Sequence, residues 1–245
     1  MSSSTASFSL RVRILPPVIL LVAVAGLRAL EAGIAVAPVR LMPQLSALAG
    51  SGGTMAVLGG LRAAVAGSFW LRANLAWERR DAGATTALLH LTVAADERPL
   101  LFWLNGARMI AYDMPEWRLG PEASRAVRRR AVVEQAGAAL EFLQRGVQWR
   151  GPAPDLLIEM ANIRLRVLGD REGAARLFRR ASEMPGAPYY AARVHGELLR
   201  ALGRPDEALA WLKKILPGLP ADEPAARREV VIQRISELES SLRGQ

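Results

Sequence analysis

Two stretches of the chain match each other at an offset of 34 residues, and this repeat constrains the fold more than any other feature of the sequence. LGDREGAARLFRRASEMP begins at Leu168, and LGRPDEALAWLKKILPGLP begins at Leu202. The offset aligns residues of similar character: Gly169 with Gly203, Ala174 with Ala208, Phe178 with Leu212, Ala181 with Ile215, and, upstream, Leu165 with Leu199. A period in the range of about 20 to 50 residues indicates stacked copies of one small structural unit.

The spacing of apolar residues predicts that this unit is helical. Apolar positions recur three and four residues apart, and no run of alternating β-branched residues is long enough to indicate a strand. Glycine, proline and aspartate interrupt the pattern, as they do at helix ends. The predicted helices cover 55–80, 84–95, 99–113, 121–147, 154–168, 171–183, 187–201, 205–216 and 222–243. The predicted fold class is therefore all-α.

The repeated segments resemble the tetratricopeptide (TPR) repeat, which has the same period and a fixed order of small and large apolar positions. Two antiparallel helices approach closely only where small side chains occupy the crossing and a large one fills the gap beside it. Ala174 and Ala208 match the small position of the second helix, and Gly196 matches that of the first, from which Asn162 departs. The resemblance implies structural roles for Gly169, Ala174, Phe178, Ala181, Gly196, Gly203, Ala208 and Leu212.

The resemblance implies a TPR-like solenoid of antiparallel helix pairs over residues 54–221, closed by a capping helix over 222–245. The last helix suits a terminal cap because its apolar residues form one stripe, made of Val231, Ile235, Leu238 and Leu242. Together with an apolar N-terminal segment, these features resemble bacterial membrane-anchored TPR-like proteins.

The apolar N-terminal segment covers residues 14–37 and follows a polar tail, residues 1–13. As a helix it is long enough to cross a bilayer, and its two charges, Arg28 and Glu31, lie three residues apart on one helix face. We predict a transmembrane anchor. A signal peptide cleaved after Ala25 and a buried helix of a soluble protein are the alternatives.

The orientation follows from the arginines in the tail, which favour a cytoplasmic N-terminus. The chain is then expected in the inner membrane as a single-pass protein with its helical domain in the periplasm. If the segment is cleaved, a soluble periplasmic or secreted protein is expected. Residues 38–53 are rich in glycine and serine and predict a flexible tether between the anchor and the helices.

Several chemistries are disfavoured by residues that the chain lacks. It has no cysteine, so a disulfide or a thiolate nucleophile is excluded, and it has only two histidines, His90 and His195. Both lie in apolar helical patterns and are expected to pack rather than to bind a ligand. Neither a phosphate-binding loop with its lysine nor a Gly-x-Ser-x-Gly motif occurs. We predict no cofactor, no metal site and no catalytic residues.

The net charge is +9, and the densest basic group consists of Arg125, Arg128, Arg129 and Arg130. Aromatic residues do not interleave with these arginines, and no nucleic-acid-reading motif is present, so a nucleic-acid partner is not expected. A patch of this kind next to an anchored segment could contact anionic lipid headgroups. We keep this contact as a secondary hypothesis.

A binding site for a partner is expected in the concave groove of the solenoid, which the first helices of the pairs line. The predicted groove-facing positions are Leu156, Glu159, Ile163, Arg166, Tyr190, Arg193, Glu197 and Arg200. Some TPR proteins hold a terminal carboxylate with a basic residue and asparagines at such positions. Arg193 matches the basic residue, but Ile163 and Glu197 replace the asparagines.

The stretch FWLNGARMIAYDMPEWR, residues 102–118, is the richest in reactive and aromatic side chains. We interpret it as packing between helices, with Gly106 allowing a close approach and Pro115 ending the helix. Asp113 and Glu116 are then expected in a solvated turn. The alternative is a pocket near Trp103, Asn105, Tyr112 and Asp113 in an envelope enzyme or enzyme subunit.

These predictions favour a scaffold or adaptor without catalysis of its own, which binds a protein partner at the bacterial cell envelope. The repeats would supply an extended surface, and the N-terminal segment would hold that surface at the membrane. The envelope enzyme remains the alternative function.

Overall fold

The computed structural model describes residues 52–117 and 119–243, and these residues are helical with no β-strand. This confirms the predicted all-α class. The helices are α3 (Gly52–Glu78), α4 (Ala82–Ala95), α5 (Leu100–Arg108), α6 (Met114–Trp117), α7 (Arg125–Trp149), α8 (Pro154–Asn162), α9 (Arg171–Ser182), α10 (Tyr189–Ala201), α11 (Pro205–Ile215) and α12 (Arg228–Arg243). Two π-helical segments, η1 (Met109–Asp113) and η2 (Ile163–Leu168), and two 3₁₀ turns, Leu216–Gly218 and Pro224–Ala226, complete the order.

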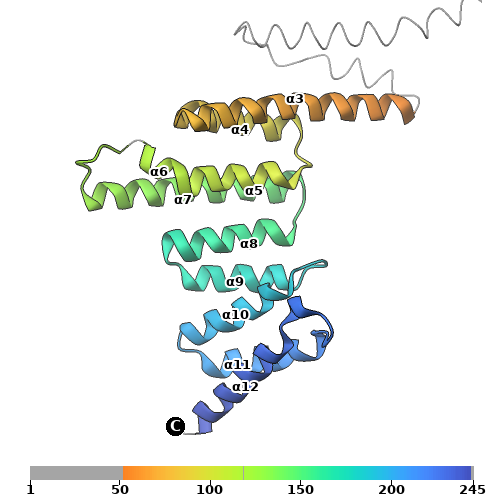
Figure 1. Cartoon of the computed structure of the whole chain (residues 1–245), viewed down its shortest axis with the longest axis vertical. Helices are drawn as coiled ribbons and strands as arrows, with labels where there is room; N and C mark the ends of the chain where they lie inside the picture. Colours follow the sequence, from red (N-terminus) through yellow and green to blue (C-terminus); the bar gives the residue numbers. More distant parts are fainter. Residues whose placement is uncertain (1–51, 118, 244–245) are drawn as a thin grey trace, which may run out of the picture. The chain divides into compact units, whose positions relative to one another are not determined.

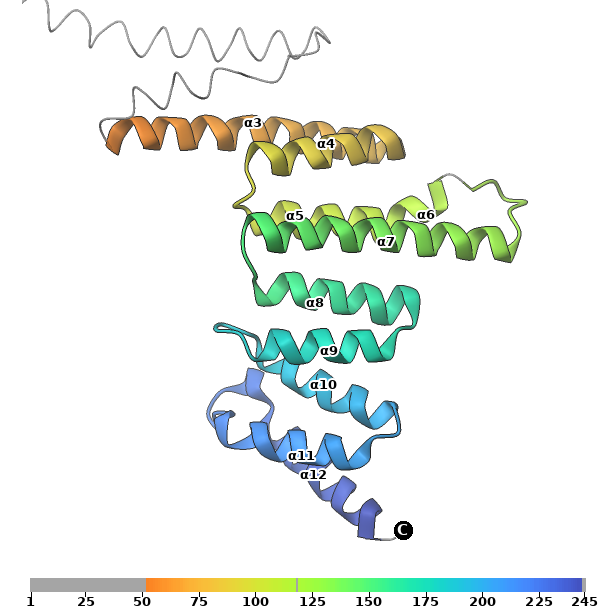
Figure 2. The ribbon, with the colours of Figure 1, turned by 180° about the vertical axis from the view of Figure 1, so that it is seen from behind.

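Residues Gly59–Gln245 form one compact unit. Within it, successive helices lie next to each other in chain order, from α4 to α12 (Figures 1 and 2). α8 packs against α9, α9 against α10, and α10 against α11, and each helix runs opposite to the one before it. Neighbours in sequence are therefore neighbours in space.

Side chains at the loops define where several helices begin. Asp81, Ser124 and Asp170 precede α4, α7 and α9, and each accepts a hydrogen bond from the backbone N–H three residues later. These bonds satisfy N–H groups that the first turn of a helix leaves unpaired. The short polar loops therefore fix the start of the helix that follows them.

The predicted end of a helix at Pro115 is wrong. The helix continues from α5 through η1 and α6 to Trp117, and the Met114 N–H bonds to the carbonyl of Met109, five residues back. Proline lacks an N–H, and its ring clashes with the carbonyl four residues earlier in a regular helix. The wider π turn gives this ring room, so the helix passes the proline instead of stopping.

A second wide turn follows Asn162, the residue that departs from the small position of the repeat. The helix changes from α to π at Ile163 and ends at Gly169, which has a φ of 72°. At the corresponding place 34 residues later, Gly196 stays within a regular helix, and a Cβ there would lie 2.8 Å from Cδ2 of Leu212. The helix α8–η2 and the helix α10 thus differ in geometry at the position where Asn162 aligns with Gly196.

Other positions aligned by the repeat share their local geometry. Gly203 has a φ of 73°, within a degree of Gly169, and both lie in the left-handed region that favours glycine. Ala174 and Ala208 are both fully buried at 0% exposure. Ala181, Phe178 and Leu212 are also buried.

The upstream core is built around Trp103, which is fully buried against α7. Its indole Nε1 donates to the carbonyl of Glu97 at 2.8 Å, and its ring lies 4.9 Å from that of Phe142. A Cβ on Gly146 would lie 2.9 Å from Cδ2 of Trp103, and one on Gly106 would lie 2.9 Å from Cε1 of Phe142. Two glycines therefore set the distance between α5 and α7, as was expected of Gly106.

The C-terminal helix is shorter than predicted, because α12 begins at Arg228 and not at residue 222. The 3₁₀ turn Pro224–Ala226 and Arg227, with a φ of 46°, occupy the predicted first turns. Val231 and Leu238 are buried against the α10–α11 core, and Ile235 packs partly against it. α12 thus covers the end of the helical stack with one apolar stripe.

The predicted tail, membrane segment and most of the tether, up to residue 51, lie outside the described residues. Among the helices that are described, none combines the length and the apolar composition needed to cross a membrane.

We predict opposite effects of one substitution at two glycines of α7. Gly146→Ala should lower the free energy of unfolding by about 1–3 kcal/mol, because its methyl group would overlap the buried ring of Trp103. Gly137→Ala, with no atom within 4 Å of its Cβ, should raise it by about 0.5–1 kcal/mol through helix propensity. Urea unfolding followed by circular dichroism measures both. Equal stabilisation by the two substitutions would contradict the packing described.

Candidate functional site

A buried carboxylate on α8, that of Glu159, is the centre of a polar group that joins α5, η1 and α8. The side chain of Glu159 is 4% exposed. Its Oε2 accepts hydrogen bonds from Nε and Nη2 of Arg108 at 3.0 and 2.8 Å, and its Oε1 accepts one from the hydroxyl of Tyr112 at 3.4 Å. A buried charge requires such partners. Glu159 therefore joins α8 to α5 and η1.

Two further residues belong to this group through their charges or rings. Burial raises the pKa of the Tyr112 hydroxyl to about 12, the Glu159 carboxylate adds to that rise, and Arg166 opposes it. Burial also raises the pKa of Tyr190 on α10, with contributions from Asp155 and Glu159. We call Arg108, Tyr112, Glu159, Arg166 and Tyr190 the Glu159 cluster.

The Glu159 cluster keeps its outer side chains accessible although its centre is buried. Tyr112 is 40% and Tyr190 41% exposed, and the Arg108 side chain is 52% exposed. Arg166 is exposed as well. The cluster spans three consecutive first helices, so it presents two aromatic rings and two guanidinium groups over an extended surface. Tyrosine and arginine are the residue types that most often dominate binding energy at protein interfaces.

The structure divides the predicted groove residues into three groups. Glu159, Arg166 and Tyr190 fall in the cluster, although Glu159 lies beneath Arg108 and does not face an open groove. Leu156 and Ile163 are fully buried at 0% exposure, so their predicted groove-facing positions are wrong. Both pack in the main core because α8 is covered by helices on more than one side.

The remaining predicted groove residues, Arg193, Glu197 and Arg200, face the C-terminal segment or one another. Glu197 accepts from Arg200 at 3.0 Å and from Arg234 of α12 at 2.6 Å. Arg193 has a 3.5 Å hydrogen bond to the carbonyl of Ala226, and burial together with Arg227 lowers its pKa. The C-terminal segment therefore forms one wall of this part of the predicted groove, where a hollow of about 290 Å³ is lined by Arg193, Glu197 and Arg234.

The side chains proposed for an enzyme pocket do not converge. Trp103 is buried against α7, Tyr112 bonds to α8, and Asp113 accepts a hydrogen bond from Nε1 of Trp77 on α3 at 2.8 Å. Asn105 has a 3.5 Å contact with Arg108. A single pocket formed by these four residues is not present, because successive helix positions point to different neighbours.

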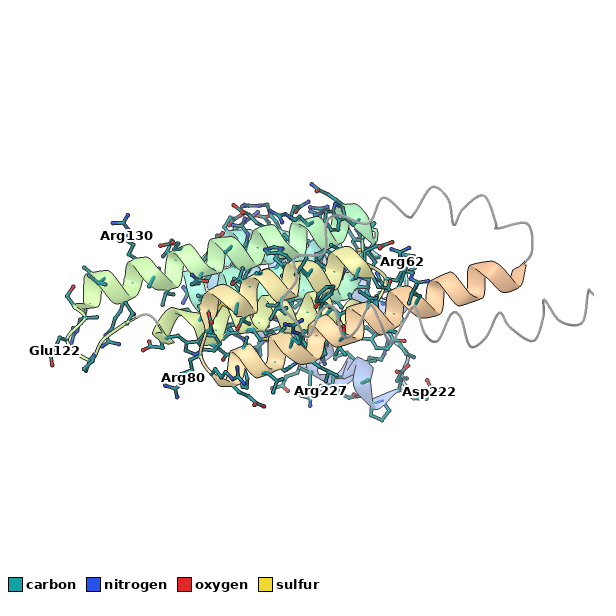
Figure 3. All side chains as sticks on the ribbon, turned by 90° about the horizontal axis from the view of Figure 1, so that it is seen from above. Arg62, Arg80, Glu122, Arg130, Asp222 and Arg227 are labelled. Atoms are coloured by element: carbon teal, nitrogen blue, oxygen red, sulfur yellow. The ribbon has the colours of Figure 1, made fainter. Side chains whose placement is uncertain are left out.

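Two of the four arginines in the basic group on α7 form hydrogen bonds with other parts of the protein. Arg128 donates to the carbonyls of Gly120, Pro121 and Ala123, and it pairs with Glu116 at 3.2 Å. Arg129 donates to the carbonyls of Val167 and Leu168 at the end of η2. Arg125 and Arg130 are exposed on the outer side of α7, where Figure 3 shows Arg130 extending away from the helices.

Both histidine rings pack against aromatic side chains. His195 is buried, its Nδ1 lies 2.9 Å from the carbonyl of Ala175, and its ring meets Trp211 edge-on at 4.7 Å. Burial lowers the pKa of His195 and of His90, whose ring packs against Phe142. Within residues 52–117 and 119–243, no three metal-binding side chains gather into a site.

Comparison with known proteins adds no relative to this description. No protein-family model matches the chain, and no curated protein matches it significantly.

We predict that Glu159→Gln lowers the pKa of Tyr112 from about 12 towards its ordinary value near 10. The neighbouring negative charge disfavours tyrosinate, and burial, which remains, keeps the new value above 10. Ultraviolet titration of tyrosinate measures the change, and Tyr112→Phe identifies the contribution of this residue among three tyrosines. An unchanged titration curve would mean that the carboxylate does not act on Tyr112.

Proposed function

We propose that the protein is a membrane-anchored, TPR-like scaffold that binds a protein partner at the bacterial cell envelope. The observation that carries this proposal is the Glu159 cluster, an accessible group of tyrosines and arginines held in place by a buried carboxylate. It extends across the first helices of three consecutive pairs, which is the side that TPR-like solenoids use for binding.

The repeat supports the TPR-like part of the proposal. Gly169 and Gly203 share a left-handed conformation 34 residues apart, and Ala174 and Ala208 are buried at equivalent positions. Each helix packs against the next in the chain, as expected of a solenoid with nearest-neighbour contacts.

The side chains of the Glu159 cluster indicate which chemical groups a partner should carry. The Glu159 charge is neutralised by Arg108, whereas Arg166 extends from η2 with no carboxylate within ion-pair distance among the described residues. Tyr112 presents a half-exposed ring near Arg166, and Tyr190 presents one near Arg108. A partner segment that places an apolar side chain against the tyrosines and a carboxylate against Arg166 fits this surface.

The membrane part of the proposal depends on the sequence of residues 14–37 and on the short distance along the chain from there to α3. An anchor at this place would hold the helical unit close to the membrane. Arg125 and Arg130, which are exposed and are not among the arginines bonded to backbone carbonyls, could supplement it by contacting anionic headgroups.

A photo-crosslinking amino acid tests the partner surface in living cells. Placed at Tyr112 or at Tyr190, it should give the same discrete crosslinked product. Placed at Arg180, an exposed residue of the second helix α9, it should give none of that product. Arg166→Glu should reduce the yield at Tyr190 by about tenfold or more, because the substitution reverses the charge offered to the partner.

The helical circular dichroism of Arg166→Glu serves as its control and should match that of the unmodified chain. Crosslinking at Arg180 as strong as at the tyrosines, or a yield insensitive to Arg166→Glu, would show that the Glu159 cluster is not the surface that binds the partner.

Fractionation tests the anchor. The full chain should remain in the membrane pellet after alkaline carbonate and 1 M salt, whereas removal of residues 14–37 should release it to the soluble fraction. Intact-mass measurement distinguishes an anchor from a signal peptide. Release of the full chain by salt alone would mean that the protein is attached to the membrane only by electrostatic contacts.

A further inference from the structure

A hollow at the C-terminal end of α3 has a composition unlike that of the Glu159 cluster. Its volume is about 500 Å³, and it is lined by Trp77, Glu78, Arg80, Asp113, Glu116 and Trp117. These residues come from the end of α3 and from the helix η1–α6, so segments about 35 residues apart in sequence form it. Figure 3 shows Arg80 at this end of α3, on the outer edge of the helices.

Two indole rings form a corner in this hollow. The ring centroids of Trp77 and Trp117 lie 6.4 Å apart, and the ring planes make an angle of 61°. Trp77 is fixed by its Nε1–H, which donates to Asp113 at 2.8 Å. Both rings are only partly buried, in contrast to Trp103 at 0% exposure. Both rings line the hollow, and Trp117 also packs against the main core.

The charge of the hollow is negative in a chain whose net charge is +9. Glu78, Asp113 and Glu116 contribute three carboxylates, and Arg80 contributes the one cation of the lining. Glu116 also pairs with Arg128, but its side chain is 66% exposed and keeps one face free. Asp113 uses one oxygen for Trp77.

Among the described residues, the cation–π contacts are those of Arg179 and Lys214 with Trp211, so no described cation forms such a contact with Trp77 or Trp117. Electron-rich ring faces set at an angle, with carboxylates at the rim, attract a compact cation with an apolar surface. A guanidinium prefers to stack flat on one ring. A corner of two rings suits a rounded methylated ammonium better.

We propose that this hollow binds a quaternary ammonium group, with Trp77 and Trp117 contacting its methyl groups and Glu78, Asp113 and Glu116 supplying the negative field. The group could belong to a small solute such as choline or to the headgroup of a choline lipid. This proposal is independent of the partner surface formed by the Glu159 cluster, because the two share no residue.

Fluorine NMR of the full chain labelled with 5-fluorotryptophan tests the site, because the six tryptophans give one resonance each. Trp77→Phe and Trp117→Phe assign the two resonances of interest. Choline chloride should shift both saturably, with a dissociation constant on the order of 1–10 mM for such an exposed site. Trp149, which is 52% exposed, is the control indole and should not shift saturably.

Two comparisons separate cation binding from nonspecific contact. The neutral isostere 3,3-dimethylbutan-1-ol should produce no saturable shift, because it has the same shape without the charge. Glu78→Gln combined with Glu116→Gln should weaken choline binding by about threefold to tenfold, whereas Glu141→Gln, an exposed site on α7, should leave it unchanged. The four other fluorine resonances report whether each variant stays folded.

Absence of a saturable shift at Trp77 and Trp117, an equal response to the neutral isostere, or a parallel shift of Trp149 would overturn the proposal. Glycerophosphocholine distinguishes the sources of the ligand. Tighter binding than that of choline indicates a lipid headgroup, and weaker binding indicates a small solute, since the hollow is already acidic and would repel the phosphate.

Discussion

Close approach of neighbouring helices, made by a glycine or alanine facing a large apolar side chain, is the constraint on which the rest of this structure depends. Gly146 faces Trp103 and Gly196 faces Leu212, with no room for even a methyl group at either crossing. Because each helix contacts mainly the next one in the chain, every crossing must be satisfied locally. Cohesion thus comes from successive local contacts, which together form two connected clusters of buried side chains.

The same constraint explains why the polar side chains of the first helices are organised as they are. Asn162 replaces the small residue of the repeat, and the helix after it widens into η2. The neighbouring helix that begins with α5 also contains a π segment, η1. Tyr112 in η1 and Arg166 in η2 then extend from wide turns near Glu159. π turns often occur at functional positions, because they redirect side chains that a regular helix would align elsewhere.

The sequence predicted much of the fold but less of the site. Helix positions followed from apolar spacing and turn residues, and most boundaries agree within a few residues because both signals are local. The π turn past Pro115 was not predicted, since proline normally interrupts a helix and only tertiary packing makes the wider turn favourable. The Arg108–Glu159 pair joins residues 51 positions apart, and no local sequence pattern predicts such a contact. Leu156 and Ile163 were misplaced for a similar reason: repeat periodicity gives a helix face, but not the neighbours that bury it.

The tryptophans show how the geometry separates cohesion from binding. Trp103 has Gly146 opposite it and is therefore enclosed, whereas Trp77 and Trp117 meet each other and a set of carboxylates at the end of two helices. Among the described glycines, none lies opposite Trp77 or Trp117, and both rings stay partly exposed. The aromatic stretch 102–117 accordingly serves two purposes. Its first part holds α5 to α7, and its last part leaves an aromatic, acidic corner at the surface, separate from the Glu159 cluster and available to a ligand of opposite charge.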